Sequence, residues 1–379
     1  MDLSDARNEI DRIDDSIVDL MKKRIEVTAQ IARYKSEHDQ SILDKGRERA
    51  ILSRMADKAG EGYEMYARAL FTTLFGIGKS YQSRAMGCRG ELSSRIHDAL
   101  ENTPRIFPNK AVVACQGTEG SYSQAATDKL FSLPNIVYFN TFEAVFQAVE
   151  QGLCDYGMLP IENSSYGSVT EVYDLMKQRD FHIARSVKLH IHHALLANVG
   201  VKLDDIKEIY SHEQAIGQCG EFLRELSDVH VNVVENTAVA ARMVKESGRS
   251  DVAAISAVDC ARLYDLNVLS ESIQNSDNNY TRFICISKKL EIYPGANKIS
   301  LMFTVPHEPG SLYSMISKFA TLGVNLTKLE SRPLAGSDFE FMFYFDMDAS
   351  VYDAAFITLL CELDETIDQF VFLGAYSEV

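Results

Sequence analysis

Positively charged residues are scarce in this sequence. Its 38 lysines and arginines face 54 aspartates and glutamates, which gives a formal net charge of -16 at pH 7. Such a surface repels nucleic acids and anionic membranes over most of its extent, so neither partner is expected. A local cluster of basic residues in such a chain is better explained as a site for a small anion.

Long apolar runs and cysteine pairs are also missing. No stretch of about 18 apolar residues occurs, and the amino-terminal segment MDLSDARNEIDRIDD is acidic and lacks the apolar core of a signal peptide. The seven cysteines form no CxxC pair and no Cys/His spacing typical of a metal site. We therefore expect a soluble, cytoplasmic protein with reduced thiols and no bound metal.

Proline is absent from the first 84 residues, which carry a dense helical pattern. Residues 1–86 are therefore predicted to form a helical domain, followed by a linker with one short helix at 87–109. Over residues 110–290, apolar β-rich runs alternate with helical stretches, which is typical of an α/β domain. The order strand, helix, strand, strand, helix, strand in residues 297–379 predicts a ferredoxin-like α+β unit. A chain of 379 residues is long enough for such a multidomain organisation.

The first helical stretch has an arginine in its apolar stripe. The stripe follows a heptad pattern, and Arg24 occupies the position expected between Leu20 and Val27. A guanidinium there is unfavourable unless it meets an anion. Lys35 lies eleven residues further on, on the same face and about 16 Å away, so the two cations could hold a small dicarboxylate. The other members of the stripe are Leu3, Ala6, Ile10, Ile13, Ile17 and Ile31.

Arg7 is too far from Arg24 to share a small ligand with it inside one helix, because the residues between them span about 25 Å. If Arg7 joins the site, it comes from a second chain, which predicts an intertwined dimer of long helices. The alternative is a solvent-exposed helix with ordinary ion pairs, for example between Arg12 and Asp11 or Asp15. The position of Arg24 in the apolar stripe favours the binding site.

The polar residues of this segment resemble those of the all-helical chorismate mutase family, with matching spacing over about 84 residues. The run ILDKGRERAIL contributes three of the matching positions. One departure is Gly78, where better known members carry a serine that faces the substrate. The seven matching residues are Arg7, Arg24, Lys35, Asp44, Arg47, Glu48 and Gln82.

The resemblance implies a pericyclic rearrangement of chorismate to prephenate that needs no nucleophile, cofactor or metal. Catalysis then comes from holding the reactive chair of the substrate and stabilising charge on the breaking ether oxygen. Lys35 and Gln82 are expected to face this oxygen, Glu48 to hold the ring hydroxyl, and Asp44 to belong to the substrate-binding set. Three arginines are expected to bind carboxylates: Arg24, Arg47 and, from the partner chain, Arg7.

Four polar runs of the central segment fall where strands should end, which is where α/β sheets bind their ligands. For the first and third runs the alternative is a helix N-cap, with Ser211 as the cap and Gln214 completing a capping box. Both readings are compatible, because a helix N-terminus also offers N–H groups to a carboxylate. The runs are QGTEGSYSQAA (116–126), PIENSSYGSV (160–169), SHEQAIGQC (211–219) and NNYTRF (278–283).

Histidines in this segment invite a hydrolase interpretation that the sequence does not favour. Ser211 and His212 are adjacent, but no GxSxG elbow is present and no acid is placed by the sequence to orient the imidazole. His192 and His193 alternate along a strand-like run and are interpreted as structural.

In this order, the four runs resemble prephenate dehydratase over about residues 111–287. The resemblance implies two α/β lobes, similar to periplasmic binding proteins, with the chain returning to the first lobe near the TRF run. The implied reaction removes carbon dioxide and the ring hydroxyl from prephenate, and Thr281 is expected to donate a proton to the leaving hydroxyl. Substrate-binding residues are expected to be Glu162, Asn163, Ser211, Gln218 and Arg282. For Arg282, a substrate carboxylate and a structural ion pair with an acid such as Glu162 remain equally open.

The runs HEPGSLYSMISKFATLGVNLTKLESRP and FEFMFYFDM resemble the ACT regulatory domain that is joined to dehydratases. Pro309 and Gly310 open a predicted helix whose free N–H groups suit an amino-acid carboxylate, although every such helix must start somewhere. The resemblance implies L-phenylalanine as an allosteric inhibitor bound between paired ACT units. The residues expected at this site are Pro309, Gly310, Ser311, Leu312, Glu330, Ser331, Arg332 and Pro333.

The sequence as a whole therefore predicts a bifunctional, feedback-inhibited enzyme of phenylalanine biosynthesis that acts on chorismate and prephenate. We expect a homodimer that could pair into a tetramer. Among enzymes, the alternative is an arogenate-preferring dehydratase. Among other classes it is a non-catalytic binding protein, because a two-lobed domain and an ACT unit are both ligand-sensing architectures.

Overall fold

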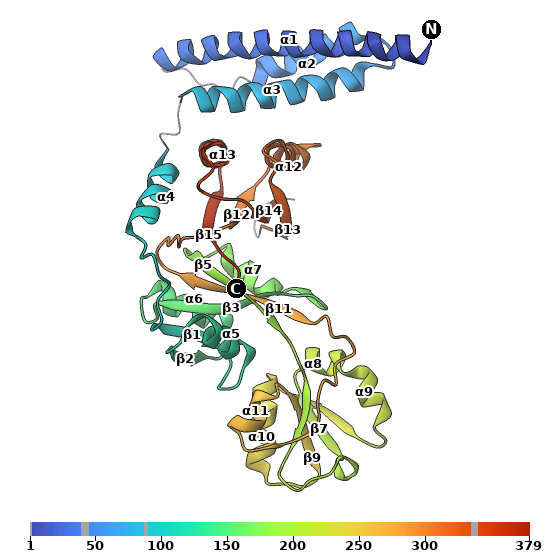
Figure 1. Ribbon diagram of the computed structural model, residues 1–379, viewed down its shortest axis with the longest axis vertical. Coiled ribbons are helices and arrows are strands. Elements are labelled where there is room, and N and C mark those ends of the chain that lie inside the picture. Colours follow the sequence, from blue (N-terminus) through green and yellow to red (C-terminus); the bar gives the residue numbers. More distant parts are fainter. Residues whose placement is uncertain (1, 39–44, 87–89, 335–339) are drawn as a thin grey trace. The chain divides into compact units, whose positions relative to one another are not determined.

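A computed structural model describes residues 2–38, 45–86, 90–334 and 340–379 of the chain (Figure 1). These residues belong to two compact units. The first contains Met1–Arg95, Thr304–Asn325 and Val351–Phe370, and the second contains Ile96–Phe303, Leu326–Ser350 and Val371–Val379. Each unit is described by itself.

The amino-terminal part of the first unit is helical, as predicted. Helices α1 (Leu3–Glu37), α2 (Lys45–Ala59) and α3 (Glu64–Met86) lie side by side, with α3 packed against both others. The side chain of Asp2 caps α1 by accepting a hydrogen bond from the Ser4 N–H at 3.2 Å. Gly60 adopts a φ of +83°, which favours glycine at the turn between α2 and α3.

The apolar stripe of α1 is exposed in the single chain. Leu3 and Leu20 retain 66% and 65% of their accessible surface, and Arg24 lies within the same stripe. Isolated exposed apolar side chains are common, but a stripe repeated along one face of a 35-residue helix is a surface suited to association. Its exposed members are Leu3, Ile10, Ile13, Ile17, Leu20, Val27 and Ile31.

A short helix, α4 (Glu91–Asn102), lies within residues 87–109, in agreement with the short helix expected in the linker. Helices α12 (Ser311–Thr321) and α13 (Ala354–Thr366) belong to the first unit, and the Lys318–Glu362 ion pair joins them.

The second unit begins with a six-stranded mixed sheet. Its strand order is β2-β1-β3-β11-β5, and β4 pairs with β3. Strands β1, β2 and β3 are parallel, whereas β11 runs antiparallel to both β3 and β5. The strands are β1 (Val112–Gln116), β2 (Asn135–Phe139), β3 (Tyr156–Asn163), β4 (Gly167–Ser168), β5 (His182–His190) and β11 (Tyr280–Ser287). The accompanying helices are α5 (Tyr122–Leu130), α6 (Phe142–Glu150) and α7 (Thr170–Met176).

A five-stranded sheet of order β10-β6-β9-β7-β8 forms a second lobe. The chain enters it between β5 and β6 and returns between β10 and β11, so the predicted two-lobed α/β fold is confirmed, including the return near Thr281. The strands are β6 (Ala194–Ala197), β7 (Glu208–Ser211), β8 (His230–Val233), β9 (Val252–Ser256) and β10 (Asn267–Ser270). The helical segments are η1 (Leu203–Asp205), α8 (Glu213–Gln218), α9 (Gly220–Glu225), α10 (Thr237–Ser247) and α11 (Asp259–Leu263).

The carboxyl-terminal strands form a third sheet of order β13-β14-β12-β15. With α12 and α13 between them in the chain, they give the predicted ferredoxin-like order. The chain end then pairs with β5: the Val379 N–H donates to the Ser186 carbonyl at 2.9 Å, and the Lys188 N–H donates to the Val379 carbonyl at 3.0 Å. The strands are β12 (Lys298–Thr304), β13 (Asn325–Pro333), β14 (Phe341–Asp348) and β15 (Phe370–Tyr376).

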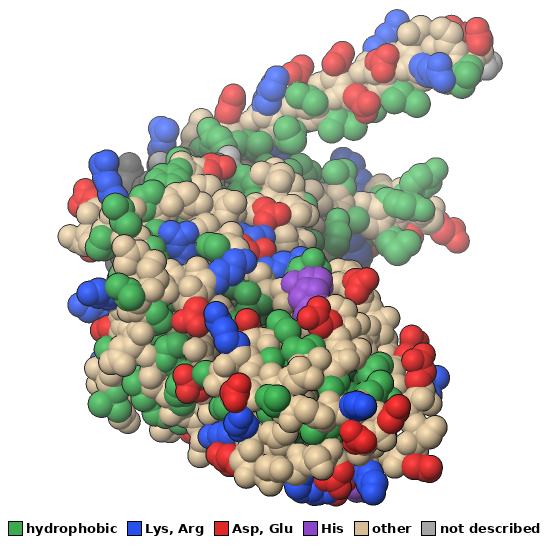
Figure 2. Space-filling view, turned by 60° about the horizontal axis from the view of Figure 1, so that its bottom comes forward, with side chains coloured by type: hydrophobic (Ala, Val, Ile, Leu, Met, Phe, Trp, Pro, Cys, Tyr) green, Lys and Arg blue, Asp and Glu red, His purple; other side chains and the backbone are tan. Residues whose placement is uncertain are grey.

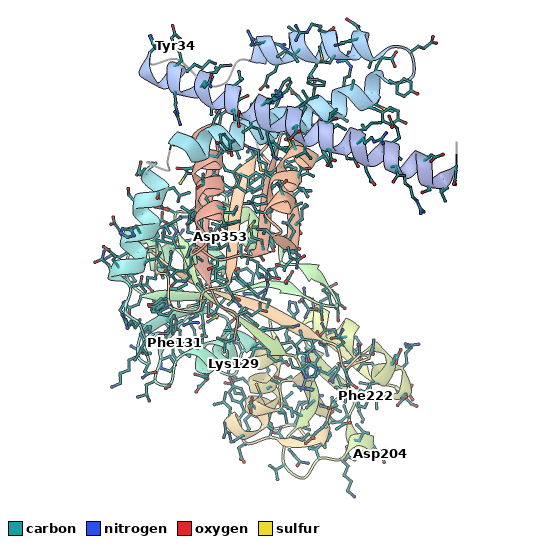
Figure 3. All side chains as sticks on the ribbon, turned by 45° about the horizontal axis from the view of Figure 1, so that its top comes forward. Tyr34, Lys129, Phe131, Asp204, Phe222 and Asp353 are labelled. Atoms are coloured by element: carbon teal, nitrogen blue, oxygen red, sulfur yellow. The ribbon has the colours of Figure 1, made fainter. Side chains whose placement is uncertain are left out.

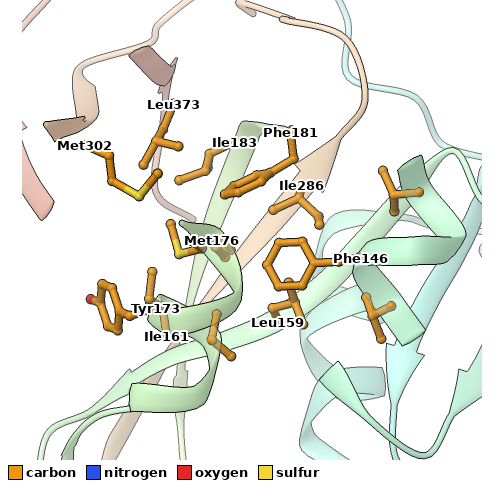
Figure 4. Packing of buried hydrophobic residues seen from close by; sticks show 14 of the residues in the cluster. Phe146, Leu159, Ile161, Tyr173, Met176, Phe181, Ile183, Ile286, Met302 and Leu373 are labelled. Carbon is orange, nitrogen blue, oxygen red and sulfur yellow. The ribbon is translucent and has the colours of Figure 1, made fainter. Parts of the chain in front are cut away.

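One hydrophobic cluster joins the first lobe to the third sheet. Figure 4 shows Phe146 and Ile286 of the lobe in the same cluster as Met302 of β12 and Leu373 of β15. A second cluster is aromatic: the Phe131 ring (Figure 3) lies 5.0 Å from that of Phe107, centroid to centroid. Burial of such side chains contributes roughly 1.5–3 kcal/mol each, so the lobe and the sheet are expected to unfold together.

The cysteines largely agree with the expectation of reduced thiols. Five are free and buried: Cys115, Cys154, Cys219, Cys260 and Cys285. Cys361, however, is disulfide-bonded, so the expectation is wrong at that position.

Two observations concern the charge of the surface and the apolar character of the helices. Acidic and basic side chains are interspersed over the face shown in Figure 2. Among the described residues, no helix has both the length and the apolar character needed to cross a membrane.

Gly374 generates a prediction about stability. Its φ is +152°, and an added Cβ would lie 2.4 Å from the carbonyl oxygen of Ile183, which is backbone and cannot rotate away. We expect Gly374→Ala to lower the free energy of unfolding by about 3 kcal/mol. The control is Gly220→Ala, where an added Cβ meets open space. Urea unfolding measures both, and a Gly374 variant as stable as its control would contradict the close packing of β15 on β5.

Candidate active sites

A pocket of about 450 Å³ lies among the first three helices. Its size is suitable for a small organic ligand. Five of the predicted residues line it together, from all three helices: Arg24, Lys35, Arg47, Glu48 and Gln82. Arg7 is exposed and is not part of the lining. Asp44 lies outside the described residues. The rest of the lining is Lys23, Val27, Thr28, Ile31, Ile51, Phe75, Gly78 and Lys79.

The contacts of Arg24 explain how a guanidinium is tolerated in an apolar stripe. Its Nη1 donates a hydrogen bond to the Leu74 carbonyl at 2.9 Å, and its Cζ lies 5.4 Å from the centroid of the Phe75 ring. Burial lowers the pKa of Arg24, while the nearby Glu48 carboxylate opposes this effect. The guanidinium is thus held in place by a backbone carbonyl and an aromatic ring, with the Glu48 carboxylate nearby.

Lys79 is a pocket residue that the sequence analysis missed. Its Nζ forms an ion pair with Glu48 Oε1 at 2.8 Å. Gln82, one turn further along α3, donates from Nε2 to the Thr28 carbonyl at 3.0 Å. The signal in the sequence for Lys79 was its spacing of three residues from Gln82, because residues three apart share a helix face.

The charge of this pocket is opposite to that of the whole chain. Five cations (Lys23, Arg24, Lys35, Arg47 and Lys79) and one carboxylate (Glu48) line it, so 5 − 1 leaves an excess of four positive charges in a protein of net charge -16. The pocket is therefore suited to a small molecule with more than one carboxylate.

In the second unit, Thr281 and Asn163 face each other across β11 and β3. Asn163 Nδ2 donates to Thr281 Oγ1 at 2.9 Å. Asn163 Oδ1 accepts from the backbone N–H groups of Ser165 and Tyr166, at 2.9 and 3.0 Å. The bond from Asn163 Nδ2 is the only hydrogen bond of Thr281 among the described side chains, so the proton of the Thr281 hydroxyl stays available to a ligand.

Gln218 reaches the same place from the second lobe. It ends α8, and its Oε1 accepts from Asn279 Nδ2 at 3.0 Å and lies 2.6 Å from His193 Nε2. No role was predicted for Asn279 from the sequence, and His193 was predicted to be structural. The only signal for Asn279 was its place in the NNYTRF run.

Arg282 lies one residue from Thr281 but is engaged elsewhere. Its Nε is 2.8 Å from Glu162 Oε1, and its Nη2 forms an ion pair with the fully buried Asp346 of β14. Burial by itself would lower the pKa of Arg282, but the carboxylate of Asp346 and other anionic neighbours raise it. Burial likewise opposes the ionised form of Glu162, and Arg282 together with Lys328 lowers its pKa.

A pocket of about 420 Å³ borders this ion-pair network, and Thr281 is not part of its lining. This agrees with strand geometry, because neighbouring residues of a strand point to opposite faces. The lining consists of Glu162, Asn163, Ser164, Lys188, Tyr280, Arg282, Lys298, Thr327, Lys328 and Glu378.

Ser211 is committed to the core of the second lobe. It is fully buried, and its Oγ donates to the Ile255 carbonyl at 2.7 Å. The alternative that Ser211 caps α8 is wrong: His212 is the N-cap, and its Nδ1 accepts from the Gln214 N–H at 3.3 Å. In the run before α5, Ser121 is the N-cap and accepts from the Gln124 N–H, as the capping alternative expects.

The residues expected to sense an amino acid fall in both units. In the first unit, Gly310 is the N-cap of α12 with a φ of +87°, Pro309 precedes it, and Ser311 and Leu312 begin the helix. In the second unit, the other four residues, Glu330, Ser331, Arg332 and Pro333, end β13.

Strand β13 contacts the first lobe through these side chains. Glu330 Oε2 accepts from Ser168 Oγ at 2.6 Å. Arg332 Nη2 lies 2.7 Å from Asp174 Oδ2, and this contact, together with the ion pair to Lys177, lowers the pKa of Asp174 to about 2. Ser331 is exposed, and the Pro333 carbonyl accepts from Lys177 Nζ at 3.0 Å.

Two family models match the chain in separate segments. The model described as "Prephenate dehydratase" matches residues 113–291. The model described as "Chorismate mutase type II" matches residues 6–83. The first match contains the Thr281 network, and the second contains the basic pocket.

Curated relatives cover one or both of these segments. Arogenate dehydratase/prephenate dehydratase 2 of Arabidopsis thaliana is 35% identical over 75% of this chain and 76% of its own length. Arogenate dehydratase 2 of Petunia hybrida is 38% identical over 70% and 71%. A bifunctional chorismate mutase/prephenate dehydratase of Aquifex aeolicus (strain VF5) is 29% identical over 99% of this chain and 98% of its own length.

Two solved structures resemble about seven tenths of the chain. A prephenate dehydratase from Arthrobacter aurescens, in complex with L-Phe, has a TM-score of 0.65 and 31% identity over 70% of this chain and 89% of its own. A protein described as a quorum quenching acylase, GqqA, has a TM-score of 0.65 and 30% identity over 71% of this chain and 98% of its own. The family matches and the two separate sites lead to one conclusion: the chain belongs to the prephenate dehydratase family and joins a prephenate dehydratase domain to an amino-terminal chorismate mutase domain.

Proposed function

We propose that the two domains catalyse consecutive reactions, chorismate to prephenate in the basic pocket and prephenate to phenylpyruvate beside Thr281. The observation that carries the proposal is the presence of two separate constellations in one chain. One is a pocket with excess positive charge, and the other a hydroxyl held by an amide network. The domain bounds 1–86, 87–109, 110–290 and 297–379 remain those predicted from the sequence.

The first reaction requires binding and electrostatics and no covalent step. Arg24 and Arg47 bind the substrate carboxylates, and Lys35 and Gln82 stabilise the negative charge that grows on the ether oxygen. Glu48 accepts a hydrogen bond from the ring hydroxyl of the substrate. This bond replaces part of the contact between Glu48 and Lys79. Asp44, which lies outside the described residues, belongs to the same proposed substrate-binding set.

The mutase site is completed by Arg7 of a second copy of the chain. Two observations support this: Arg7 does not line the pocket of its own chain, and the apolar stripe of α1 is exposed. Pairing of two α1 helices would cover the stripe and bring Arg7 of one copy to the pocket of the other. The homodimer, and its pairing into a tetramer, are part of this proposal.

Mixing two inactive variants tests the shared site. Lys35→Ala and Arg7→Ala should each lower the mutase rate about 100-fold, because each removes a cation from every site. After exchange of subunits, an equal mixture should recover about a quarter of the wild-type rate, since half the dimers are mixed and one of their two sites is intact. Light scattering checks that both variants remain dimers.

The control is Lys22→Ala, which removes an exposed cation of the same helix. Full mutase activity of Lys35→Ala would contradict the site, and absence of recovery on mixing would contradict the contribution of Arg7 from a partner.

The second reaction breaks two bonds of prephenate together. The ring carboxylate leaves as carbon dioxide, its bonding electrons complete the aromatic ring, and the ring hydroxyl departs and takes up a proton to become water. Thr281 donates the hydrogen bond, and in a concerted step the proton, to that oxygen, and the threonine oxygen takes a proton back from solvent water. Asn163 and Gln218 orient the substrate. Because the Ser211 hydroxyl is bound to Ile255, Ser211 contributes by supporting α8.

We assign Arg282 and Glu162 the structural alternative. The guanidinium already meets two carboxylates, and separating a buried ion pair costs about 3–5 kcal/mol. Their pairing fixes the strand positions next to Thr281 and Asn163.

Thr281→Ala is expected to lower the dehydratase rate about 100-fold or more, because the variant lacks the hydroxyl that donates to the leaving oxygen, while the mutase rate of the same chain stays unchanged. Thr281→Ser keeps the hydroxyl and should retain most of the activity. Separate assays of chorismate consumption and phenylpyruvate formation measure both. Normal phenylpyruvate formation by Thr281→Ala would refute the role of Thr281.

L-phenylalanine is the proposed inhibitor, bound between paired ACT units by the segments Pro309–Leu312 and Glu330–Pro333. Support comes from the L-Phe complex of the Arthrobacter aurescens relative and from the contacts of Glu330 and Arg332 with the first lobe. Inhibition requires that L-phenylalanine bind a less active arrangement more tightly than the active one.

We expect L-phenylalanine at about 1 mM to lower the dehydratase rate and to raise the midpoint of thermal unfolding, since a ligand that binds only the folded state stabilises it. D-phenylalanine is the matched control and should have little effect. If L-phenylalanine changed neither the rate nor the unfolding midpoint, the regulatory proposal would fail.

The proposal includes three further points. The enzyme works in the cytoplasm, which the five free cysteines support. Neither reaction needs a cofactor or metal. Arogenate is a second candidate substrate for the Thr281 site, because the relatives from Petunia hybrida and Arabidopsis thaliana carry that name. Comparing turnover of arogenate and prephenate by the purified protein distinguishes them.

A further inference from the structure

The two segments that cross between the lobes each place one buried polar side chain beside the Thr281 site. His193 lies between β5 and β6, and Asn279 lies between β10 and β11. Their exposed fractions are 2% and 1%. The Ile191 N–H donates to the Asn279 carbonyl at 2.8 Å, so the two crossings lie side by side. Buried polar groups in such a position need hydrogen-bond partners, and both have them.

The direction of every amide in this network follows from the backbone. Asn163 Oδ1 accepts two backbone N–H groups, from Ser165 and Tyr166, and a backbone N–H can only donate. The other end of the Asn163 amide must therefore be Nδ2. This nitrogen donates to Thr281 Oγ1 and to Asn279 Oδ1, both at 2.9 Å.

The same logic continues through the next two side chains. Because Asn279 Oδ1 faces Asn163, Asn279 Nδ2 faces Gln218, and it donates to Gln218 Oε1 at 3.0 Å. The returning contact, from Gln218 Nε2 to Asn279 Oδ1, is longer, at 3.4 Å. Gln218 Oε1 then accepts from His193 Nε2 at 2.6 Å, which places the proton of a neutral His193 on Nε2.

His193 closes the chain of hydrogen bonds. Burial lowers its pKa, which favours the neutral ring. Its Nδ1 lies 3.4 Å from the hydroxyl of Tyr122, and that hydroxyl donates to the His192 carbonyl at 2.7 Å. The ring is thus held from both sides with a single donor, directed at Gln218.

We propose that Asn279 and His193 are positioning residues of the dehydratase site, which hold the Gln218 amide in one direction by donating to its oxygen, next to the Asn163 amide that the backbone orients and that leaves the Thr281 proton free for the substrate. If the Gln218 amide reversed, its nitrogen and oxygen would exchange places, and Gln218 would no longer present the same group to the substrate beside Thr281. The inference rests on the proposed role of Thr281, and it adds residues from both crossings to the site.

Two substitutions of His193 separate hydrogen bonding from packing. Leucine fills similar space without a donor, whereas the amide of glutamine can donate to Gln218 Oε1 as Nε2 of the ring does. His193→Leu should lower the kcat of the dehydratase about 10- to 100-fold, and His193→Gln should retain most of it. His192→Leu makes the same change at the exposed neighbouring histidine and should leave the dehydratase rate unchanged. The mutase rate of each variant reports that the chain is folded.

Equal losses in His193→Leu and His193→Gln would overturn the inference, since the donor would then be irrelevant, and so would a wild-type rate in His193→Leu. A second measurement does not depend on turnover. Asn279→Asp replaces the donor that faces Gln218 by an acceptor, so the Gln218 amide should reverse and the proton of His193 should move from Nε2 to Nδ1.

Nuclear magnetic resonance of the imidazole nitrogens in the whole protein distinguishes the two tautomers. An unchanged tautomer in Asn279→Asp would overturn the chain of hydrogen bonds. This outcome is separate from the failure of the proposed function, which would appear as a normal dehydratase rate in Thr281→Ala.

Discussion

A buried guanidinium holds the second unit together. Arg282 is nearly inaccessible, and its charge is stable there only because Glu162 of β3 and Asp346 of β14 meet it. Each partner belongs to a different sheet, so the ion pairs fix β11 against the first lobe and against the carboxyl-terminal sheet. Thr281 and Asn163 are the chain neighbours of Arg282 and Glu162, and their placement depends on the same contacts.

The two proposed active sites use different physical means for substrates of similar charge. The basic pocket has an excess of cations, and the reaction proposed there needs no proton transfer, so the proposed contribution of the pocket is electrostatic and geometric. At the dehydratase site, the side chains around Thr281 are neutral amides. Their value lies in the direction of their dipoles, which the backbone N–H groups next to Asn163 determine. A reaction in which hydroxide must leave is accelerated when a hydroxyl proton, here that of Thr281, is free to reach the leaving oxygen.

The sequence predicted what depends on local pattern. Arg24 stood out because a charge in an apolar heptad stripe is costly, and the pocket indeed contains it with Lys35. The α/β class followed from alternating strand and helix patterns, and the two lobes were implied by the resemblance of the ordered motifs to prephenate dehydratase. The capping alternative for Ser211 was wrong because the next residue, His212, takes that position with its own ring nitrogen. Short-range rules place such a boundary only to within a residue or two.

What the sequence could not predict depends on contacts between distant segments. Asp346 is 64 residues from Arg282, and nothing in its own strand marks it as a partner. The link from Asn279 to Gln218 exists only because the two lobe crossings lie side by side. Lys79 carried a readable signal in its spacing from Gln82, but a lysine on an exposed helix face is common and does not stand out without the pocket.

The central claim is that one chain performs two reactions in sequence at two separate sites. The most direct test follows chorismate, prephenate and phenylpyruvate over time after chorismate is added to the purified wild-type protein. The account predicts that chorismate falls, that prephenate rises and then declines, and that phenylpyruvate accumulates to the amount of chorismate consumed. If chorismate were not consumed, or if prephenate accumulated without phenylpyruvate, the assignment of the corresponding site would be contradicted.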